Sequence, residues 1–326
     1  MLGCLSAMVS NVPQIDHPFL GIEIGGTKLQ MVVGRHDTGI VHRRRFSVEA
    51  GRGAQSIREN IVGALPGILS EWAPAAVGVG YGGPVNWRTG QIVKSYHVPG
   101  WHEFPLGDWL SGLAGIPVFV ENDGNTAAYG EAVAGAGRGA DPVFYTTIGS
   151  GVGGGLVHAG AIYHGYTGGE AEVGHLRFGT GGQITESFCS GWSIDRRIRE
   201  AVEAGGRGVL AELVAGDPGN EARHLGAALA VGDAFAVQVL EEAAGQLAVA
   251  LSHVVHLFHP EVLILGGGVS LIGEPWLSAV ERHLGVLVMD AFLPAPRLVL
   301  SALREDAVPV GALALAAQRS GCVSPN

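Results

Sequence analysis

The chain has 326 residues, of which 47% are hydrophobic and 15% charged, with a net charge of −10. Such a composition excludes a disordered chain and a coiled coil, because both are rich in charged residues. The chain has no basic stretch interleaved with aromatic residues and no uninterrupted apolar run of about 18 residues, so neither nucleic acid nor a membrane is an expected partner.

Strand-like runs alternate with turns and helices from residue 19 onward. We interpret residues 1–18 as a poorly ordered leader, because they lack the basic start of a signal peptide. The first half predicts three strands, a helix with Pro66 inside it and a fourth strand. Loops, a further helix, a fifth strand and an Ala-rich helix that ends near Ala134 follow. The predicted segments are Phe19–Ile24, Leu29–Val33, Ile40–Val48, Gln55–Trp72, Ala76–Gly80 and Pro117–Val120.

The pattern then starts again, with strands on both sides of a second glycine turn. Several helices follow, the clearest from Asp233 to Phe258, where apolar residues recur every three or four positions. The remaining segments are the strands Val143–Ile148, Gly154–His158, Ala161–Tyr163, Glu261–Leu265 and Leu298–Ser301 and the helices Ser193–Ala204, Val209–Ala215, Glu221–Ala230 and Val310–Arg319.

The repeated opening predicts two related α/β halves, with a ligand site in the cleft between them. Because no low-complexity linker is present, we expect a short hinge near Asn125 to Glu131. A length of about 150 residues per domain also favours two domains.

Three glycine turns follow predicted strands. They are Gly25-Gly26-Thr27-Lys28, Gly149-Ser150-Gly151-Val152-Gly153 and Gly266-Gly267-Gly268. Backbone N–H groups in such turns can hold phosphate oxygens, although a single glycine turn is usually only a turn. Neither the P-loop nor the Rossmann spacing fits them.

Two polar clusters are candidates for chemistry. Asp123 ends a predicted strand, where it could cap the following helix or act as a general base for a hydroxyl. Glu172 and His175 lie in glycine-rich chain, where they could be a solvated loop and a core histidine or could converge on a polyol.

Taken together, these segments resemble the ROK family (repressors, open reading frames and kinases). Six motifs occur in family order from about residue 20 to 320. They are Gly21-Ile22-Glu23-Ile24-Gly25-Gly26-Thr27-Lys28, Gly78-Val79-Gly80-Tyr81-Gly82-Gly83-Pro84-Val85, Val120-Glu121-Asn122-Asp123-Gly124-Asn125, Thr147 to Gly155, Glu172-Val173-Gly174-His175 and Leu265-Gly266-Gly267-Gly268-Val269-Ser270.

The resemblance implies an α/β, two-domain, actin-like ATPase (ribonuclease H-like) fold with a cleft between the domains. The first domain would be residues 19–125 plus a C-terminal helix in 306–326, and the second would be residues 126–305. It also implies a cytoplasmic hexose kinase, and a homodimer, that uses ATP and Mg²⁺ to phosphorylate the 6-hydroxyl of a hexose, with glucose as the default.

The same resemblance implies roles for individual residues. Asp123 would take the proton of the sugar hydroxyl. The sugar would be bound by Gly82, Gly83, Asn122, Asp123, Glu172, His175 and Glu186. The nucleotide would be held by Gly25, Gly26, Thr27, Lys28, Thr147, Gly149, Ser150, Gly151, Gly266, Gly267 and Gly268.

Two departures from the family pattern affect metal binding. Glu23 stands where the family usually has Asp, and we expect its longer carboxylate to reach Mg²⁺ directly or through water. The cysteines of the family's zinc motif have no counterpart after His175, because the segment that ends at Glu186 is shorter. We therefore predict no zinc; the chain's three cysteines, Cys4, Cys189 and Cys322, also form no disulfide framework.

Two alternatives stay open. Zinc-free relatives include polyphosphate-dependent glucokinases, which would need a basic groove. A sugar-binding regulator without catalysis is the second, although such a protein has no chemical need for Asp123. The family's DNA-binding repressors carry an N-terminal helix-turn-helix, and 18 residues before the first strand are too few for one.

Overall fold

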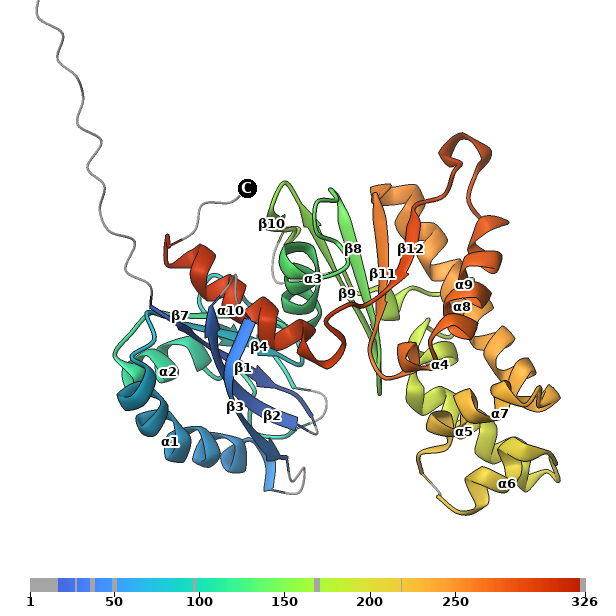
Figure 1. Cartoon of the computed structure of the whole chain (residues 1–326), viewed down its shortest axis with the longest axis horizontal. Coiled ribbons are helices and arrows are strands. Elements are labelled where there is room, and N and C mark those ends of the chain that lie inside the picture. Colours follow the sequence, from blue (N-terminus) through green and yellow to red (C-terminus); the bar gives the residue numbers. More distant parts are fainter. Residues whose placement is uncertain are drawn as a thin grey trace, which may run out of the picture.

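Two sheets stand side by side in the computed structural model, with helices between them and on both outer sides (Figure 1). The structure describes residues 17–26, 28–35, 39–48, 52–95, 98–166, 171–217 and 219–322. The predicted leader lies outside these residues except for His17 and Pro18.

The first sheet has five strands in the order β3-β2-β1-β4-β7. β1 pairs antiparallel with β2 and parallel with β4, so the antiparallel opening leads into a parallel half. The strands are β1 (Phe19–Ile24), β2 (Lys28–Arg35), β3 (Gly39–Ser47), β4 (Val77–Tyr81) and β7 (Val118–Asn122).

The second sheet repeats this topology with the order β10-β9-β8-β11-β12. Its first three strands are again antiparallel and its last two parallel. They are β8 (Val143–Ile148), β9 (Val152–His158), β10 (Ala161–Ile162), β11 (Val262–Gly266) and β12 (Arg297–Leu300). The prediction of two related halves is confirmed.

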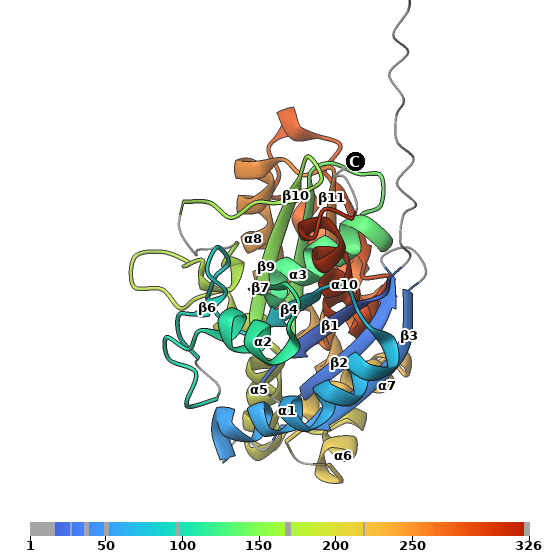
Figure 2. The same cartoon turned by 90° about the vertical axis from the view of Figure 1, so that its left-hand side faces the viewer.

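Two helices, α1 (Gly53–Trp72) and α2 (Leu106–Ala114), cover the outer face of the first sheet (Figure 2). Ile57, Ile61 and Leu110 bury themselves there against the alternating apolar residues of the strands. α2 is the helix expected before the strand at Pro117–Val120, whereas the small hairpin of β5 (Val85–Asn86) and β6 (Gln91–Ile92) was not predicted from the sequence.

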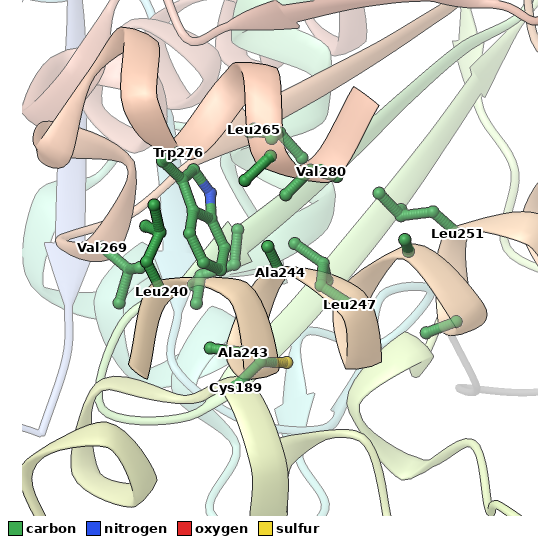
Figure 3. Close-up of a cluster of buried hydrophobic side chains, with 14 of the residues drawn as sticks. Cys189, Leu240, Ala243, Ala244, Leu247, Leu251, Leu265, Val269, Trp276 and Val280 are labelled. Carbon is green, nitrogen blue, oxygen red and sulfur yellow. The ribbon is translucent and has the colours of Figure 1, made fainter. Parts of the chain in front are cut away.

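The outer face of the second sheet is covered by α8 (Ala234–Phe258) and α9 (Glu274–Gly285). Figure 3 shows Trp276 of α9 packed above Leu240 and Ala244 of α8. Smaller helices flank this core. They are α4 (Glu186–Cys189), α5 (Gly191–Glu203), α6 (Val209–Ala215) and α7 (Leu225–Ala230).

α8 follows its predicted boundaries, and Asp233 caps its first turn by accepting a hydrogen bond from the backbone N–H of Ala236. Val237 and Phe258, which belong to the predicted apolar stripe, are 42% and 38% exposed instead. Among the helices that the structure describes, α8 alone is long and apolar enough to cross a bilayer, but half of that window is buried. Packing in the core of the second half accounts for its apolar character.

Between the sheets lie α3 (Asp123–Ala134) and α10 (Ala307–Arg319). α3 follows the last strand of the first sheet but packs on β8 and β9, whereas α10 follows the last strand of the second sheet and packs on β1 and β4. The halves thus exchange helices. The two helices touch so closely that a Cβ on Gly311 would lie 1.8 Å from the carbonyl oxygen of Thr126.

The predicted hinge at Asn125–Glu131 is the body of α3, whose residues from Gly124 to Glu131 are all buried. A buried helix, rather than a flexible link, therefore connects the halves. The proposed domain boundaries, 19–125 with 306–326 and 126–305, stay a prediction.

Candidate functional site

A cavity of about 540 Å³ lies between the two sheets, where the first and second glycine turns, at Gly25 and Gly149, face the end of β7. Its lining contains most of the residues singled out in the sequence. The lining residues are Gly25, Gly26, Gly82, Gly83, Pro84, Asn122, Asp123, Thr147, Gly149, Ser150, Gly151, Val152, Gly153, Gly154, Glu172, His175 and Glu186.

Other predicted site residues lie elsewhere. Lys28, Glu23 and the turn Gly266-Gly267-Gly268 are not among the lining residues, and Thr27 lies outside the described residues. The third glycine turn is nevertheless a neighbour of the second, because Gly266 pairs with Thr147 across β11 and β8. Gly267, with a φ of 82°, lies so close to Ile148 that a Cβ would lie 2.5 Å from its backbone.

Asp123 begins α3 at the point where β7 ends. The cap of this helix is Asn122, whose Oδ1 accepts a hydrogen bond from the backbone N–H of Asn125 at 3.1 Å. Asn122 also donates from Nδ2 to the carbonyl of Gly83 at 3.2 Å, which fixes the loop that carries Gly82. Capping therefore falls to Asn122, and the Asp123 carboxylate lines the cavity.

The pKa of Asp123 is raised from its ordinary value to about 7. Burial is the main cause, and the negative charges of Glu23 and Glu172 add to it, while a hydrogen bond from the backbone N–H of Gly124 opposes it. A carboxyl with a pKa near neutrality can accept a proton from a hydroxyl and release it again.

Three further polar side chains reach the same cavity from the second half. Glu172 caps a single turn of 3₁₀ helix (Val173–His175) that His175 ends. Burial raises the pKa of Glu172, with the His175 charge opposing the shift. Glu186, at the start of α4, accepts a hydrogen bond from the backbone N–H of Val152 at 2.9 Å. The shortened loop therefore still brings Glu186 to the cavity.

Glu23 has the chemistry of a magnesium ligand but is engaged here with protein groups. One carboxylate oxygen lies 3.2 Å from Nζ of Lys28, and the other accepts a hydrogen bond from Gln30. Among the described residues no group of three or more His, Cys, Asp or Glu side chains could hold a metal ion. One carboxylate fits Mg²⁺ that is also bound by phosphates and water, since Mg²⁺ commonly uses one or two protein carboxylates.

Sequence reasoning did not single out Pro84, Val152, Gly153 or Gly154 as individual site residues, although all of them line the cavity. Gly153 and Gly154 lie inside the segment Thr147 to Gly155, so the motif already indicated them. Val152 lies in the same segment, but the sequence did not indicate that its backbone N–H would donate to Glu186.

Comparisons with known proteins match nearly the whole chain. The model of the ROK family matches residues 19–319. The glucokinase of Thermotoga maritima is 30% identical over 311 residues, which cover 93% of this chain and 98% of that protein.

Solved structures agree with the sequence matches. A ROK family glucokinase from Streptomyces griseus, in complex with glucose and AMPPNP, is 31% identical, with a TM-score of 0.82, 92% of this chain and 99% of that chain covered. A ROK family transcriptional regulator, a homologue of the Escherichia coli MLC protein, has a TM-score of 0.83 at 21% identity, with 95% of this chain and 80% of that chain covered; this shows the fold alone. The predicted two-domain actin-like ATPase fold is confirmed.

Proposed function

The chain belongs to the ROK family, and from this premise we propose that it is a hexose kinase that transfers the γ-phosphoryl group of ATP to the 6-hydroxyl of glucose. The observation that carries the proposal is the position of Asp123. Its carboxylate, with a pKa of about 7, lines one cavity together with Glu172, His175 and both glycine turns.

Asp123 acts as the general base in this proposal. As the sugar 6-oxygen forms its bond to the γ-phosphorus, its proton passes to the Asp123 carboxylate and the bond to the leaving ADP breaks. Phosphoryl transfer depends on alignment and charge stabilisation, so the position of the base matters more than its basicity. Asn122 supports this by capping α3 and fixing the backbone beside Asp123.

The sugar occupies the side of the cavity near Glu172, His175 and Glu186. Carboxylate and imidazole groups can hydrogen-bond several hydroxyls, as recognition of a polyol requires. Gly82 and Gly83 let the ring approach their backbone, since a side chain at Gly82 would point at the Asp123 carboxylate.

The nucleotide phosphates occupy the side that is formed by Gly25, Gly26, Thr147 and the turn Gly149–Gly151, with Gly266–Gly268 on the adenosine side. The proposal also assigns Thr27 and Lys28 to nucleotide binding. Bound Mg²⁺ would neutralise phosphate charge during transfer, with Glu23 as its protein ligand.

Polyphosphate is a less favoured donor because the chain carries a net charge of −10 and two of the three arginines on β3 form ion pairs. Arg43 and Arg45 form ion pairs with Asp306 and Glu305. A regulator without catalysis would share the fold, yet it would gain nothing from a base with a pKa near 7.

Three further expectations belong to this proposal. We expect a homodimer, a cytoplasmic location where ATP is available, and no zinc. Elemental analysis of the purified protein tests the last, and one zinc per chain would contradict it.

The first experiment measures ADP release from Mg-ATP by the purified protein across glucose, mannose, fructose, N-acetylglucosamine and N-acetylmannosamine, with a blank that contains no sugar. Sugar-dependent ADP, highest with glucose, is the expected result. No sugar phosphorylation with ATP, but sugar phosphate formed from polyphosphate, would show that polyphosphate is the donor. Silence with both, combined with sugar binding by calorimetry, would favour the regulator.

A further inference from the structure

A buried contact joins the two halves beside the cavity without lining it. His164 follows β10 in the second half, and its Nε2 lies 2.6 Å from Oε2 of Glu121 in β7 of the first half. The two side chains are 11% and 1% exposed, respectively. Water therefore competes weakly for this hydrogen bond, and a bond to a buried carboxylate is strong and directional.

The carboxylate of Glu121 also holds the backbone of the catalytic strand end. Its other oxygen, Oε1, accepts hydrogen bonds from the backbone N–H of Asn122 at 3.0 Å and from Nδ2 of Asn125 at 3.2 Å. One side chain thus links His164 to the residue directly before Asp123 and to the first turn of α3.

The face of the His164 ring is also in contact with the first half. The imidazole stacks on Trp87, with ring centroids 4.1 Å apart and planes at 20°. The guanidinium groups of Arg88 and Arg319 lie 4.7 and 4.6 Å from the Trp87 ring centre. Because Trp87 lies between β5 and β6, the first half holds this imidazole of the second half on two sides.

His164 precedes Glu172 by eight residues, so it lies at the start of the chain segment that carries the sugar ligands Glu172 and His175. We propose that His164 is a positioning residue, which ties this segment to β7 and so sets where the sugar lies relative to Asp123. The inference rests on the proposed function and names a further residue for the same site.

The pair of His164 and Glu121 fixes the relative position of the two halves more than it stabilises the fold. A buried polar pair loses hydration on folding, so an apolar pair of similar volume could hold the halves together as well. In contrast to an apolar pair, a hydrogen bond of 2.6 Å to a stacked ring also fixes the distance and the angle between His164 and Glu121. Alignment of this kind matters for phosphoryl transfer, where small displacements of reacting groups cost rate.

The test compares His164→Ala with His164→Gln, whose side-chain amide can donate close to the original Nε2 position. We expect His164→Ala to lower kcat/KM for the sugar by about tenfold, with a KM for ATP within about twofold of the wild type. His164→Gln should recover most of the loss. A purely structural role would lower thermal stability and leave the sugar parameters unchanged.

His283→Ala is the matched control, because His283 makes a similar contact of 2.9 Å to Glu241 between α9 and α8, away from the cavity. It should leave the kinetics unchanged. If His164→Ala does not fold, Trp87→Leu removes the stack and should give a smaller loss of the same kind.

Three results would overturn the inference. The first is a kcat/KM for the sugar within twofold of the wild type in His164→Ala. The second is the same result in Trp87→Leu, where that variant replaces His164→Ala. The third is an equal loss of kcat/KM in His283→Ala. In these cases the wild-type enzyme is active, and the proposed function stands. A wild-type protein that neither binds nor phosphorylates any sugar overturns both.

Discussion

β7 and β12 occupy equivalent places at the ends of their sheets, and each leads into a helix that packs on the other sheet. At the end of β7, Asp123 faces the cavity. At the end of β12, the Ser301 hydroxyl donates to the buried carboxylate of Glu131, which also accepts hydrogen bonds from the backbone N–H groups of Ala302 and Leu303.

The difference lies in how each carboxylate is satisfied. Glu131 is fully buried and accepts four hydrogen bonds, the fourth from the backbone N–H of Ala136, so it is committed to structure. Asp123 accepts a hydrogen bond from Gly124, and its proton affinity is raised towards neutrality. The same topology therefore gives one strand end that carries the proposed base and one that joins the halves.

The strongest test of this contrast removes the base. Asp123→Asn should lower kcat by about 10²-fold or more, because the amide cannot accept the proton of the hydroxyl, while sugar binding by calorimetry survives. Ser301→Ala, at the equivalent strand end, should keep kcat close to that of the wild type. Near-normal turnover of Asp123→Asn would remove the assignment of the base.

A methyl group inserted between α3 and α10 should cause the largest loss of stability. Gly311→Ala places a methyl group against the backbone of Thr126, so we expect a loss of about 3 kcal/mol in the free energy of unfolding, measured with urea. Gly63→Ala is the control, because Gly63 of α1 faces open space and alanine is the better helix former. It should stabilise by about 0.5–1 kcal/mol. Equal effects in both variants would contradict close packing at Gly311.

The structural carboxylate can be tested by an isosteric change. Glu131→Gln replaces an acceptor oxygen with an NH₂ group that faces N–H donors, so we expect a loss of about 2 kcal/mol in unfolding free energy. The kcat at neutral pH should change little. A variant as stable as the wild type would show that the Ser301 end is not held by this charge.

The smallest expected effect is the pH dependence of Asp123. With a pKa of about 7, kcat/KM should rise about tenfold between pH 6 and pH 8, since the base must be ionised. A raised pKa also lowers the stability of the fold as pH rises from about 4 through 7. Asp123→Asn should therefore melt above the wild type at pH 8 but not at pH 4. A flat rate profile would contradict the shifted pKa.

Local patterns in the sequence predicted most of this fold. The strands of both sheets, the glycine turns and α8 follow from alternation, turn residues and helical spacing. A helix was expected before β7 but without bounds, and α2 lies there, ended by Gly115 with a φ of 68°. α9 was missed, although Pro275 stands in its first turn and it buries Trp276.

The site was predictable as far as its residues lie in recognisable motifs. Asp123, Glu172 and His175 were singled out from the sequence, and the structure brings them to one cavity. The cap at Asn122 and the pair of Glu121 with His164 were not predicted, because the partner in a long-range contact leaves no local pattern. The stretch near Asn125 to Glu131 is a tightly packed helix, as its Ala-rich sequence indicated, and the hinge expected there stays a prediction.

The exchange of α3 and α10 has a consequence for synthesis on the ribosome. β1 and β4 emerge early, yet one face of their sheet is covered only when Ala307–Arg319 has been made. Until then, strand residues such as Val32 and Phe19 are left exposed to solvent. The first sheet therefore completes its packing only after the last helix has been made, and apolar surface that stays uncovered during synthesis favours aggregation.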